Sequence, residues 1–289
     1  FLRKILARKP ATIFIRNVVP YSNMKQFLRI LFKIIIFGFL TFISQIGGIA
    51  FLFSLYLNKK WKSNIKVKPI ITFLAIYLIF TLIVVPIIAP IFGREKIKNT
   101  VKIKPTNFMT VLLNRNYVKP KLNILLKKTE KELQNTEIEI HYLDANFPFI
   151  DKFPLLPHLS HNDGKKIDIS LIYENPNGEY SKKQKSISGY GVFEKPKKNE
   201  FNQIEKCLNL GFFQYDFPKY LTFGRINKSL KFSKNGNKKL ILSFLKSELL
   251  GKLFIEPHLK NRLNLKNNKI RYHGCRAVRH DDHIHLQLK

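Results

Sequence analysis

Two long uncharged stretches dominate the first third of the chain. Residues 34–57 (IIIFGFLTFISQIGGIAFLFSLYL) and residues 69–93 (PIITFLAIYLIFTLIVVPIIAPIFG) contain no charged side chain. Each exceeds the roughly 20 residues that a helix needs to cross a bilayer core, and neither has the polar stripe of a soluble helix. The pattern predicts two transmembrane helices over 34–93. The length of the first stretch, and the lack of a small-residue cleavage site after it, argue against a signal peptide.

Basic residues flank these stretches on both sides, and they leave the orientation open. The loop 58–68 carries five Lys and no acid, so the positive-inside rule places it in the cytoplasm. The flank 1–33 carries eight Lys or Arg and no acid, which favours the opposite orientation. The sequence begins at Phe1, so it is either a fragment or starts naturally at Met24, which would shorten the basic flank.

Beyond the apolar stretches, helical and strand periodicities are mixed. Residues 94–118 are expected to form a basic connector that leaves the membrane, and residues 119–289 a folded domain. Spacing predicts helices over 119–135, 237–250 and 258–263, and strands over 136–143, 165–173, 252–256, 269–273 and 283–288. This order predicts an α+β fold with a central antiparallel sheet. Residues 175–200 are expected to form a long loop or hairpin, in which SGYG (188–191) is a turn or a flexible lip.

The excess of basic residues indicates which kinds of partner this chain could bind. The chain has 51 Lys+Arg against 19 Asp+Glu, a formal net charge of +32. Such an excess suggests nucleic acid or an anionic membrane. The basic residues are mostly Lys, spread among Asn, Ile and Phe, and no nucleic-acid-binding motif stands out. We therefore expect a membrane partner and no nucleic acid.

The two cysteines, Cys207 and Cys275, lack the spacing of a structural zinc site. If their domain lies outside the cytoplasm, they could form one disulfide. The alternative is a pair of buried thiols.

Five of the eight histidines fall in two short windows, HLSHNDGKKID (158–168) and HDDHIH (280–285). Neutral imidazole and carboxylate are ligands that zinc prefers. His161 on a loop and Asp168 on the next strand can approach one point, whereas two histidines of the second window share one face of a strand, about 7 Å apart. The windows are compatible with a catalytic metal site that has an open position. A structural zinc site and solvated imidazoles remain alternatives, and spacing alone does not say which histidines are ligands.

The two windows resemble the metallopeptidases of the lysostaphin and D-Ala-D-Ala peptidase superfamily, which carry His-x(6)-Asp and a later His-x-His on a strand. They are most similar to the penicillin-insensitive murein endopeptidase family, which has His-x-x-His first and His-x-x-His-x-His second. The segment KLFIEPHLKNRL (252–263) is also similar to that family. The resemblance covers roughly residues 154–289 and not the apolar stretches. His258 and His273 match none of its motif positions, and we expect them to be structural.

The resemblance implies a zinc ion held by His161, Asp168 and His285. It implies that His283 acts beside the metal, as a catalytic base or as a stabiliser of the transition state. The zinc would lower the pKa of a bound water and polarise a carbonyl group.

Four other residues of the windows are expected near the metal rather than on it. His280 is grouped with the catalytic residues, and His158 with those that support the metal or contact the substrate; both correspondences are weaker. Asp281 and Asp282 are expected to orient neighbouring imidazoles, as carboxylates often do in zinc sites, or to form a solvated pair.

The expected function is that of a membrane-anchored zinc peptidase that hydrolyses peptidoglycan cross-link peptides, at an amide bond involving a D-amino acid. Such a substrate lies outside the cytoplasmic membrane, which favours a cytoplasmic loop 58–68 and a periplasmic C-terminal domain. The transmembrane helices depart from the soluble enzymes of the family. Two alternatives are a D,D-carboxypeptidase or dipeptidase that acts on small wall peptides, and a non-catalytic protein that binds the wall or a partner.

Overall fold

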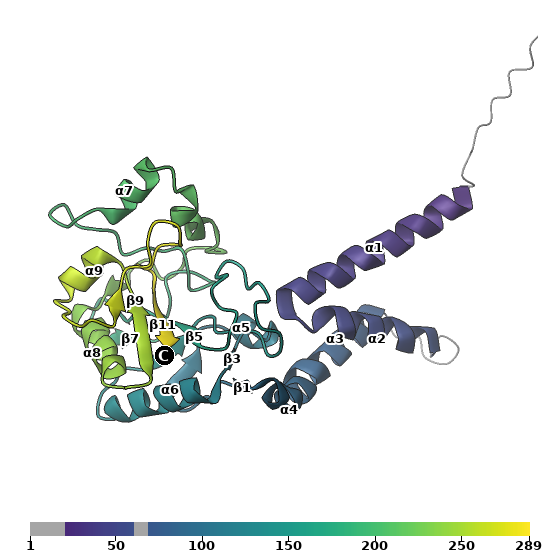
Figure 1. The fold of residues 1–289 in the computed structure, drawn as a ribbon, viewed down its shortest axis with the longest axis horizontal. Helices are drawn as coiled ribbons and strands as arrows, with labels where there is room; N and C mark the ends of the chain where they lie inside the picture. The colour runs from purple at the N-terminus through teal and green to yellow at the C-terminus, as the bar shows by residue number, and fades with distance from the viewer. Residues whose placement is uncertain (1–20, 61–68) are drawn as a thin grey trace, which may run out of the picture.

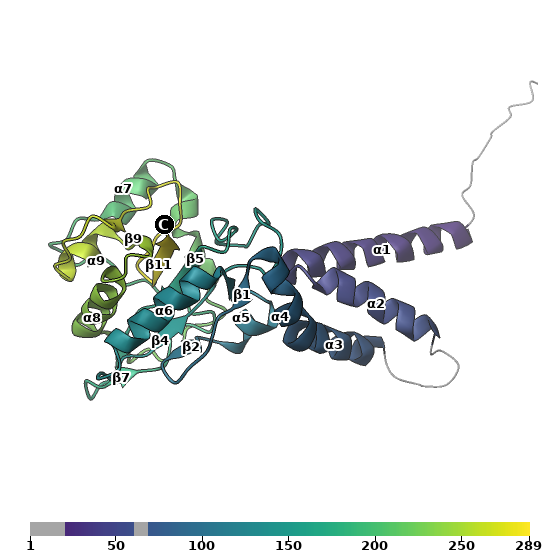
Figure 2. The same cartoon turned by 60° about the horizontal axis from the view of Figure 1, so that its bottom comes forward.

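The computed structural model describes residues 21–60 and 69–289, in which apolar helices project from one side of a folded domain (Figures 1 and 2). The projecting part comprises α1 (Tyr21–Ser44), α2 (Gly47–Lys60), α3 (Pro69–Ile79), η1 (Phe80–Val84), α4 (Val85–Ile88) and η2 (Ala89–Phe92). By length and composition, the helices Met24–Ser44 and Pro69–Phe92 could each cross a membrane. Most of the flank 1–33 and of the loop 58–68 lies outside the described residues.

The stretch 34–57, predicted as one helix, is broken in two. α1 ends at Ser44, and α2 begins at Gly47 and runs back away from the domain (Figures 1 and 2). Gln45 between them has a φ of 61°, and a Cβ on Gly47 would lie 2.5 Å from the carbonyl oxygen of Leu40. Only glycine allows so close an approach of the two backbones. The single-helix prediction is wrong because hydropathy does not detect a turn between two equally apolar segments.

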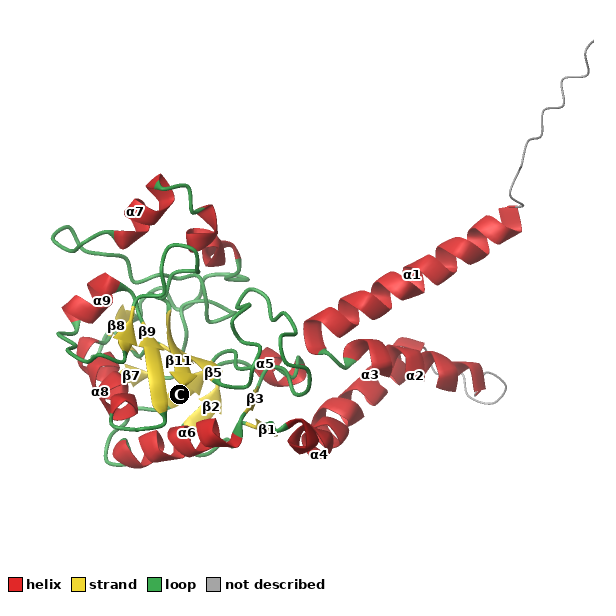
Figure 3. Ribbon diagram, viewed as in Figure 1, coloured by secondary structure: helices red, strands yellow, loops and turns green. Residues whose placement is uncertain are grey.

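The domain is α+β, as Figure 3 shows. Its main sheet has six strands in the order β10-β9-β11-β5-β4-β2. These strands are β2 (Ile103–Pro105), β4 (Ile140–Tyr142), β5 (Lys166–Ser170), β9 (Leu250–Phe254), β10 (Ile270–Arg271) and β11 (His283–Leu288). The predicted antiparallel pairing holds for β9, β11, β5 and β4, but β10 is parallel to β9 and β2 is parallel to β4. The sheet is therefore mixed, because both edge strands arrive through crossover connections rather than hairpins.

The remaining elements complete the domain around this sheet. Residues 94–118, expected as a connector, supply the edge strand β2, the short helix α5 and a two-stranded ribbon of β1 and β3. A three-stranded sheet, β7-β6-β8, accounts for part of the predicted loop region. The bounds are β1 (Glu95–Lys96), β3 (Tyr117–Val118), β6 (Tyr173–Glu174), β7 (Tyr180–Ser181), β8 (Lys231–Phe232), α5 (Phe108–Leu112), α6 (Pro120–Glu132), α7 (Gln203–Asn209), η3 (Phe213–Tyr220), α8 (Lys234–Leu245) and α9 (Pro257–Arg262).

The two faces of the central strands differ in chemistry. Ile167 and Ile169 of β5 join Ile284 and Leu286 of β11 in a core cluster that also contains leucines of α6 and α8. Because side chains alternate along a strand, the other face of β5 and β11 carries Asp168 and two histidines. The hydrophobic periodicity that fixes the core thus also fixes the face on which these polar side chains gather.

Candidate metal site

Two imidazole nitrogens and one carboxylate oxygen, from His161, His285 and Asp168, form a compact triangle on the polar face of the sheet. Asp168 Oδ1 on β5 lies 2.8 Å from His285 Nδ1 on β11 and 3.1 Å from His161 Nε2 on the preceding loop. The two nitrogens are 3.1 Å apart. The register of the sheet sets part of this arrangement, because His285 is the cross-strand partner of Asp168. The three side chains that the resemblance assigns to zinc therefore converge at one point.

The triangle suits a small cation in its dimensions and in its donor atoms. With bonds of about 2.0–2.1 Å, a tetrahedral zinc ion separates its ligand atoms by about 3.3 Å, slightly more than the three distances here. The Nδ1 atom of His161 lies 2.6 Å from the carbonyl oxygen of Ala145, which can only accept a hydrogen bond. Nδ1 therefore carries the proton, and Nε2 presents its lone pair to the centre of the triangle. A carbonyl that fixes the tautomer of a ligating histidine is a common feature of metal sites.

A second histidine of the first window approaches the other oxygen of the same carboxylate. His158 Nδ1 lies 3.0 Å from Asp168 Oδ2, and the hydroxyl of Tyr190 donates to that oxygen over 2.9 Å. His158, His161 and Asp168 form a buried group that could hold a metal ion. His161 and Asp168 belong both to this group and to the triangle with His285, so the two sets differ only in their third histidine.

The electrostatics keep the ligand atoms in the state that a metal requires. Burial alone would raise the pKa of Asp168, but His161 and the other imidazoles around it hold that pKa well below its usual range. Burial lowers the pKa of His285 to about 4, despite the opposing effect of Asp168, and holds the pKa of His158 well below its ordinary value. The carboxylate of Asp168 is thus ionised, and the rings of His285 and His158 are neutral near pH 7, which is the form in which each group can bind a cation.

His283 stands beside the triangle in a different electrostatic environment. Its Nδ1 lies 2.5 Å from Asp282 Oδ1, and the backbone N–H of Gly191 donates to the other oxygen of that carboxylate over 2.6 Å. Among the described residues its Nε2 has no hydrogen-bond partner, and it lies 3.6 Å from Asp168 Oδ1. Burial opposes the charged ring, but the carboxylates of Asp168 and Asp282 outweigh it and raise the pKa of His283 to about 9.

The two adjacent aspartates of the second window have separate roles. Asp282 orients the ring of His283, as expected. Asp281 instead accepts two hydrogen bonds from the guanidinium of Arg279, at 2.5 and 2.7 Å, and lies 3.6 Å from Nε2 of the buried His258. Asp281 therefore stabilises the segment that leads into β11, and its contacts in the described structure are with Arg279 and His258 rather than with the triangle.

Two further histidines border the site. The ring of His280 lies 4.9 Å from that of His283 and 5.6 Å from that of His285, measured between centroids. The ring of His273 lies 5.3 Å from His280 and 6.0 Å from His285. The sequence motif includes His280 but not His273, which we expected to be structural. Sequence spacing could not bring His273 to the site, because a loop rather than a strand carries it there.

The segment SGYG forms a wall of the site, a role that the sequence does not reveal. The Tyr190 hydroxyl accepts from the backbone N–H of Asp144 over 3.1 Å as well as donating to the metal-site carboxylate. The flanking Gly189 and Gly191 have φ values of 85° and 78°. A Cβ at Gly189 would lie 2.2 Å from the side chain of Leu143, and one at Gly191 would lie 2.2 Å from a backbone oxygen. The glycines are needed to bury the tyrosine, and the only sequence signal is a single Tyr between two Gly.

A groove of ≈ 460 Å³ opens beside the cluster. Its walls are the loop Leu156–Ser160, the side chains of Gln214 and Phe217 from η3, and part of the segment 273–280. The triangle itself is almost completely shielded from solvent, whereas His158 and His280, each 4% exposed, line the groove. A ligand in the groove would therefore contact the edge of the cluster at His158 and His280.

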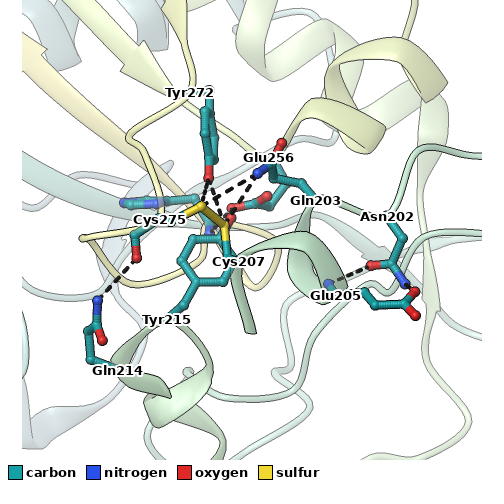
Figure 4. Close-up of a disulfide and its surroundings, with 10 residues drawn as sticks. Asn202, Gln203, Glu205, Cys207, Gln214, Tyr215, Glu256, Tyr272 and Cys275 are labelled. Carbon is teal, nitrogen blue, oxygen red and sulfur yellow. Dashed lines mark hydrogen bonds between the residues drawn. A yellow bond between two sulfur atoms is a disulfide. The ribbon is translucent and has the colours of Figure 1, made fainter. Parts of the chain in front are cut away.

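A disulfide links Cys207 to Cys275, whose neighbour Arg276 lines the groove (Figure 4). Cys207 lies on α7, and Cys275 lies in the segment before β11. The Gln214 side chain donates to the carbonyl oxygen of Cys275 over 3.1 Å, and Tyr215 donates to Glu256 over 2.6 Å. Of the two alternatives for the cysteines, the structure shows the disulfide, and it attaches α7 to the segment 273–280. A disulfide of this kind is typical of domains outside the cytoplasm.

Comparisons with known proteins do not indicate a function. No protein-family model matches the chain, and a search of curated proteins finds no match. The resemblance to murein endopeptidases therefore rests on the two histidine windows and on the geometry into which they fold.

Proposed function

We propose that this protein is a membrane-anchored zinc peptidase, with His161, Asp168 and His285 as its metal ligands. The observation that carries the proposal is the triangle of three mutually close donor atoms, contributed by a loop and by two paired strands. Its donor chemistry, the low pKa of His285 and the adjacent His283 nitrogen, which has no hydrogen-bond partner among the described residues, together match a catalytic zinc site better than a structural one, which would close its fourth position with a protein ligand.

His285 is favoured over His158 as the third ligand. His161 and His285 approach the same oxygen of Asp168, and their nitrogens are in contact with each other. His158 approaches the opposite oxygen, where Tyr190 also donates. In this arrangement His158 and Tyr190 hold the carboxylate in place, and its other oxygen would be free to bind the ion.

The surrounding side chains provide the groups that peptide hydrolysis requires. A zinc ion at the triangle would supply a Lewis acid that polarises an amide carbonyl and makes a water molecule more acidic. His283, oriented by Asp282, presents Nε2 toward the same point and can donate a hydrogen bond or move a proton there. The shielded walls exclude bulk water, which strengthens these interactions.

The arrangement of the apolar helices supports a location of the domain outside the cytoplasm. α1, α2 and α3 all have one end at the domain and one end remote from it (Figures 1 and 2). The break at Gln45 therefore puts the start of α1, which carries Lys25, and the end of α2, which carries Lys59 and Lys60, at remote ends of the helices. These basic helix ends then satisfy the positive-inside rule together, with the domain on the opposite side of the membrane. The disulfide is consistent with this orientation.

The substrate that we propose is a peptidoglycan cross-link peptide, cleaved at an amide bond involving a D-amino acid. The support for this substrate is the resemblance of the two histidine windows. One observation favours the alternative of a carboxypeptidase that acts on small wall peptides. Arg276 is exposed, lines the groove, and forms no ion pair within the described part of the chain, so its guanidinium could bind a terminal carboxylate.

The proposal is tested with the full chain purified in detergent. Metal analysis is expected to find one zinc ion per chain, and hydrolysis is expected to stop on chelation and to return with added zinc. His161→Ala and His285→Ala should lose zinc and activity, whereas His141→Ala, which alters a histidine paired with Glu139 away from the site, should keep both. Full activity in either ligand variant would overturn the ligand assignment. Cleavage of intact sacculi supports the endopeptidase, and cleavage of soluble muropeptides alone supports the carboxypeptidase.

A further inference from the structure

α5 is an apolar element on the surface of a strongly basic domain. It lies in the run Pro105–Asn114, in which no residue is charged. The Asn107 side chain caps its first turn by accepting from the backbone N–H of Thr110 over 3.2 Å. Phe108 and Met109 point outward, with 63% and 55% of their surfaces exposed. Neither side chain contributes to the core or to the metal site.

Two hydrogen bonds attach the end of α5 to the apolar helix that begins at Pro69. The Tyr77 hydroxyl donates to the carbonyl oxygen of Leu112 over 2.7 Å. The side-chain amide of Asn114 donates to the hydroxyl of Thr81 over 3.3 Å, and both groups are buried. The domain therefore contacts this helix along its length, not only at the end where the chain leaves it.

These contacts set the depth of α5. The helix Pro69–Phe92 has 24 residues, which at about 1.5 Å per residue span roughly 36 Å. Tyr77 then lies roughly 12 Å, and Thr81 roughly 18 Å, from the Pro69 end. A bilayer core of about 30 Å that lies within the length of this helix covers both positions. The end of α5 consequently lies at the level of the hydrocarbon layer.

Further contacts prevent the domain from moving away from this position. Arg94, two residues after the helix ends, is buried and donates to the backbone carbonyl of Phe147 and to Asp151. The backbone N–H of Phe149 donates to the side chain of Gln45 over 3.1 Å. The chain leaves the membrane helix without a linker and is clamped to the turn between α1 and α2.

We propose that α5 is a second membrane contact of this protein, in which Phe108 and Met109 are immersed in the lipid that surrounds the transmembrane helices. The proposal rests on the membrane-anchoring part of the proposed function and does not depend on zinc or hydrolysis. The occupant is a bilayer because the exposed apolar side chains of α5 belong to an element bonded to Tyr77 and Thr81, beside the exposed apolar residues Leu74 and Leu78 of α3. Amphipathic elements of this kind bind the membrane through buried apolar area. As a consequence, the domain is fixed at the membrane surface, and its groove reaches only peptides presented close to that surface.

Fluorescence quenching by lipid tests this inference. The chain has one tryptophan, at position 61, so Trp61→Phe gives a tryptophan-free background. Into it we introduce Phe108→Trp, Met109→Trp, Phe39→Trp on α1 as a report on the anchor, and Leu242→Trp on α8 as a remote control. Figures 1 and 2 show α8 at the side of the domain away from the helices, and Leu242 is exposed. Each full-length variant is reconstituted in phosphatidylcholine vesicles with and without brominated acyl chains.

The expected result is at least a twofold loss of emission in brominated vesicles for the tryptophans at positions 39, 108 and 109, and little loss at position 242. Quenching at position 39 but not at 108 or 109 overturns the α5 contact and leaves the anchor intact. In that case quenching by acrylamide, which is dissolved in the water, distinguishes a tryptophan on α5 that is exposed to water from one that is covered by protein. Either finding contradicts the proposal. Absence of quenching at all four positions overturns the membrane anchor and this contact together. An unchanged circular dichroism spectrum for each variant confirms that the domain is folded.

Discussion

The identity of the third ligand can be decided by comparing His285→Ala with His158→Ala. Both side chains are buried and both lie within 3.0 Å of the same carboxylate, but they approach different oxygens. Zinc binding contributes about 10–16 kcal/mol in complete protein sites, so each of four ligands contributes roughly 3 kcal/mol, or about a hundredfold to a thousandfold in affinity. A residue that only supports a ligand contributes about tenfold to a hundredfold. His285→Ala is therefore expected to weaken zinc binding about ten times more than His158→Ala does.

The assay is a competition between the protein and a chromophoric zinc chelator, performed at one pH for both variants and the parent. Circular dichroism of each metal-free variant checks that the sheet is intact, because both changes remove a buried imidazole. The reasoning is refuted if His158→Ala weakens zinc binding as much as, or more than, His285→Ala in folded protein. That result would make His158, His161 and Asp168 the ligand set.

Three further predictions concern the supports of the site. Tyr190→Phe removes a hydroxyl that donates to the metal-site carboxylate and leaves a backbone N–H unsatisfied, so it should cost about 1–3 kcal/mol in urea unfolding and weaken zinc binding about tenfold to a hundredfold. The double substitution Cys207→Ser and Cys275→Ser removes a cross-link between residues 68 positions apart. In the same assay the double variant should be about 4 kcal/mol less stable than the parent protein with its disulfide intact, and equal stability of variant and parent would contradict this. Burial lowers the pKa of His258 to about 4, whereas the unfolded residue takes up its proton near 6.5. Folding stability from this group is therefore fully present above pH 6.5 and declines by up to about 3 kcal/mol as the pH falls toward 4. Denaturant titrations of metal-free protein should show a smaller decline in His258→Gln.

The spacing of apolar residues predicted the helices and strands that support the site better than it predicted how the strands pair in the sheet. The alternation HIHLQL gave the strand β11 with its observed bounds, and the spacing of leucines gave α6 to within a few residues. Other elements, such as β4 and α8, are shorter than their periodicity suggested, since tertiary contacts decide where regular hydrogen bonding ends. The parallel pairing of β2 and β10 could not be predicted, because period-two patterns do not record the direction of a neighbouring strand.

By itself, the sequence determined which side chains face the apolar core and which remain for the site. Alternating residues fixed the polar faces of β5 and β11, and long uncharged stretches fixed which segments can enter a bilayer. Only the tertiary structure decided how groups remote in sequence come together. It placed Tyr190 and His273 at the site, turned the chain at Gln45, and attached the end of α5 to the apolar helix that begins at Pro69. The physical reason is that periodicity is a property of neighbouring residues, whereas a distance near 3 Å between atoms more than a hundred residues apart depends on how the whole domain packs.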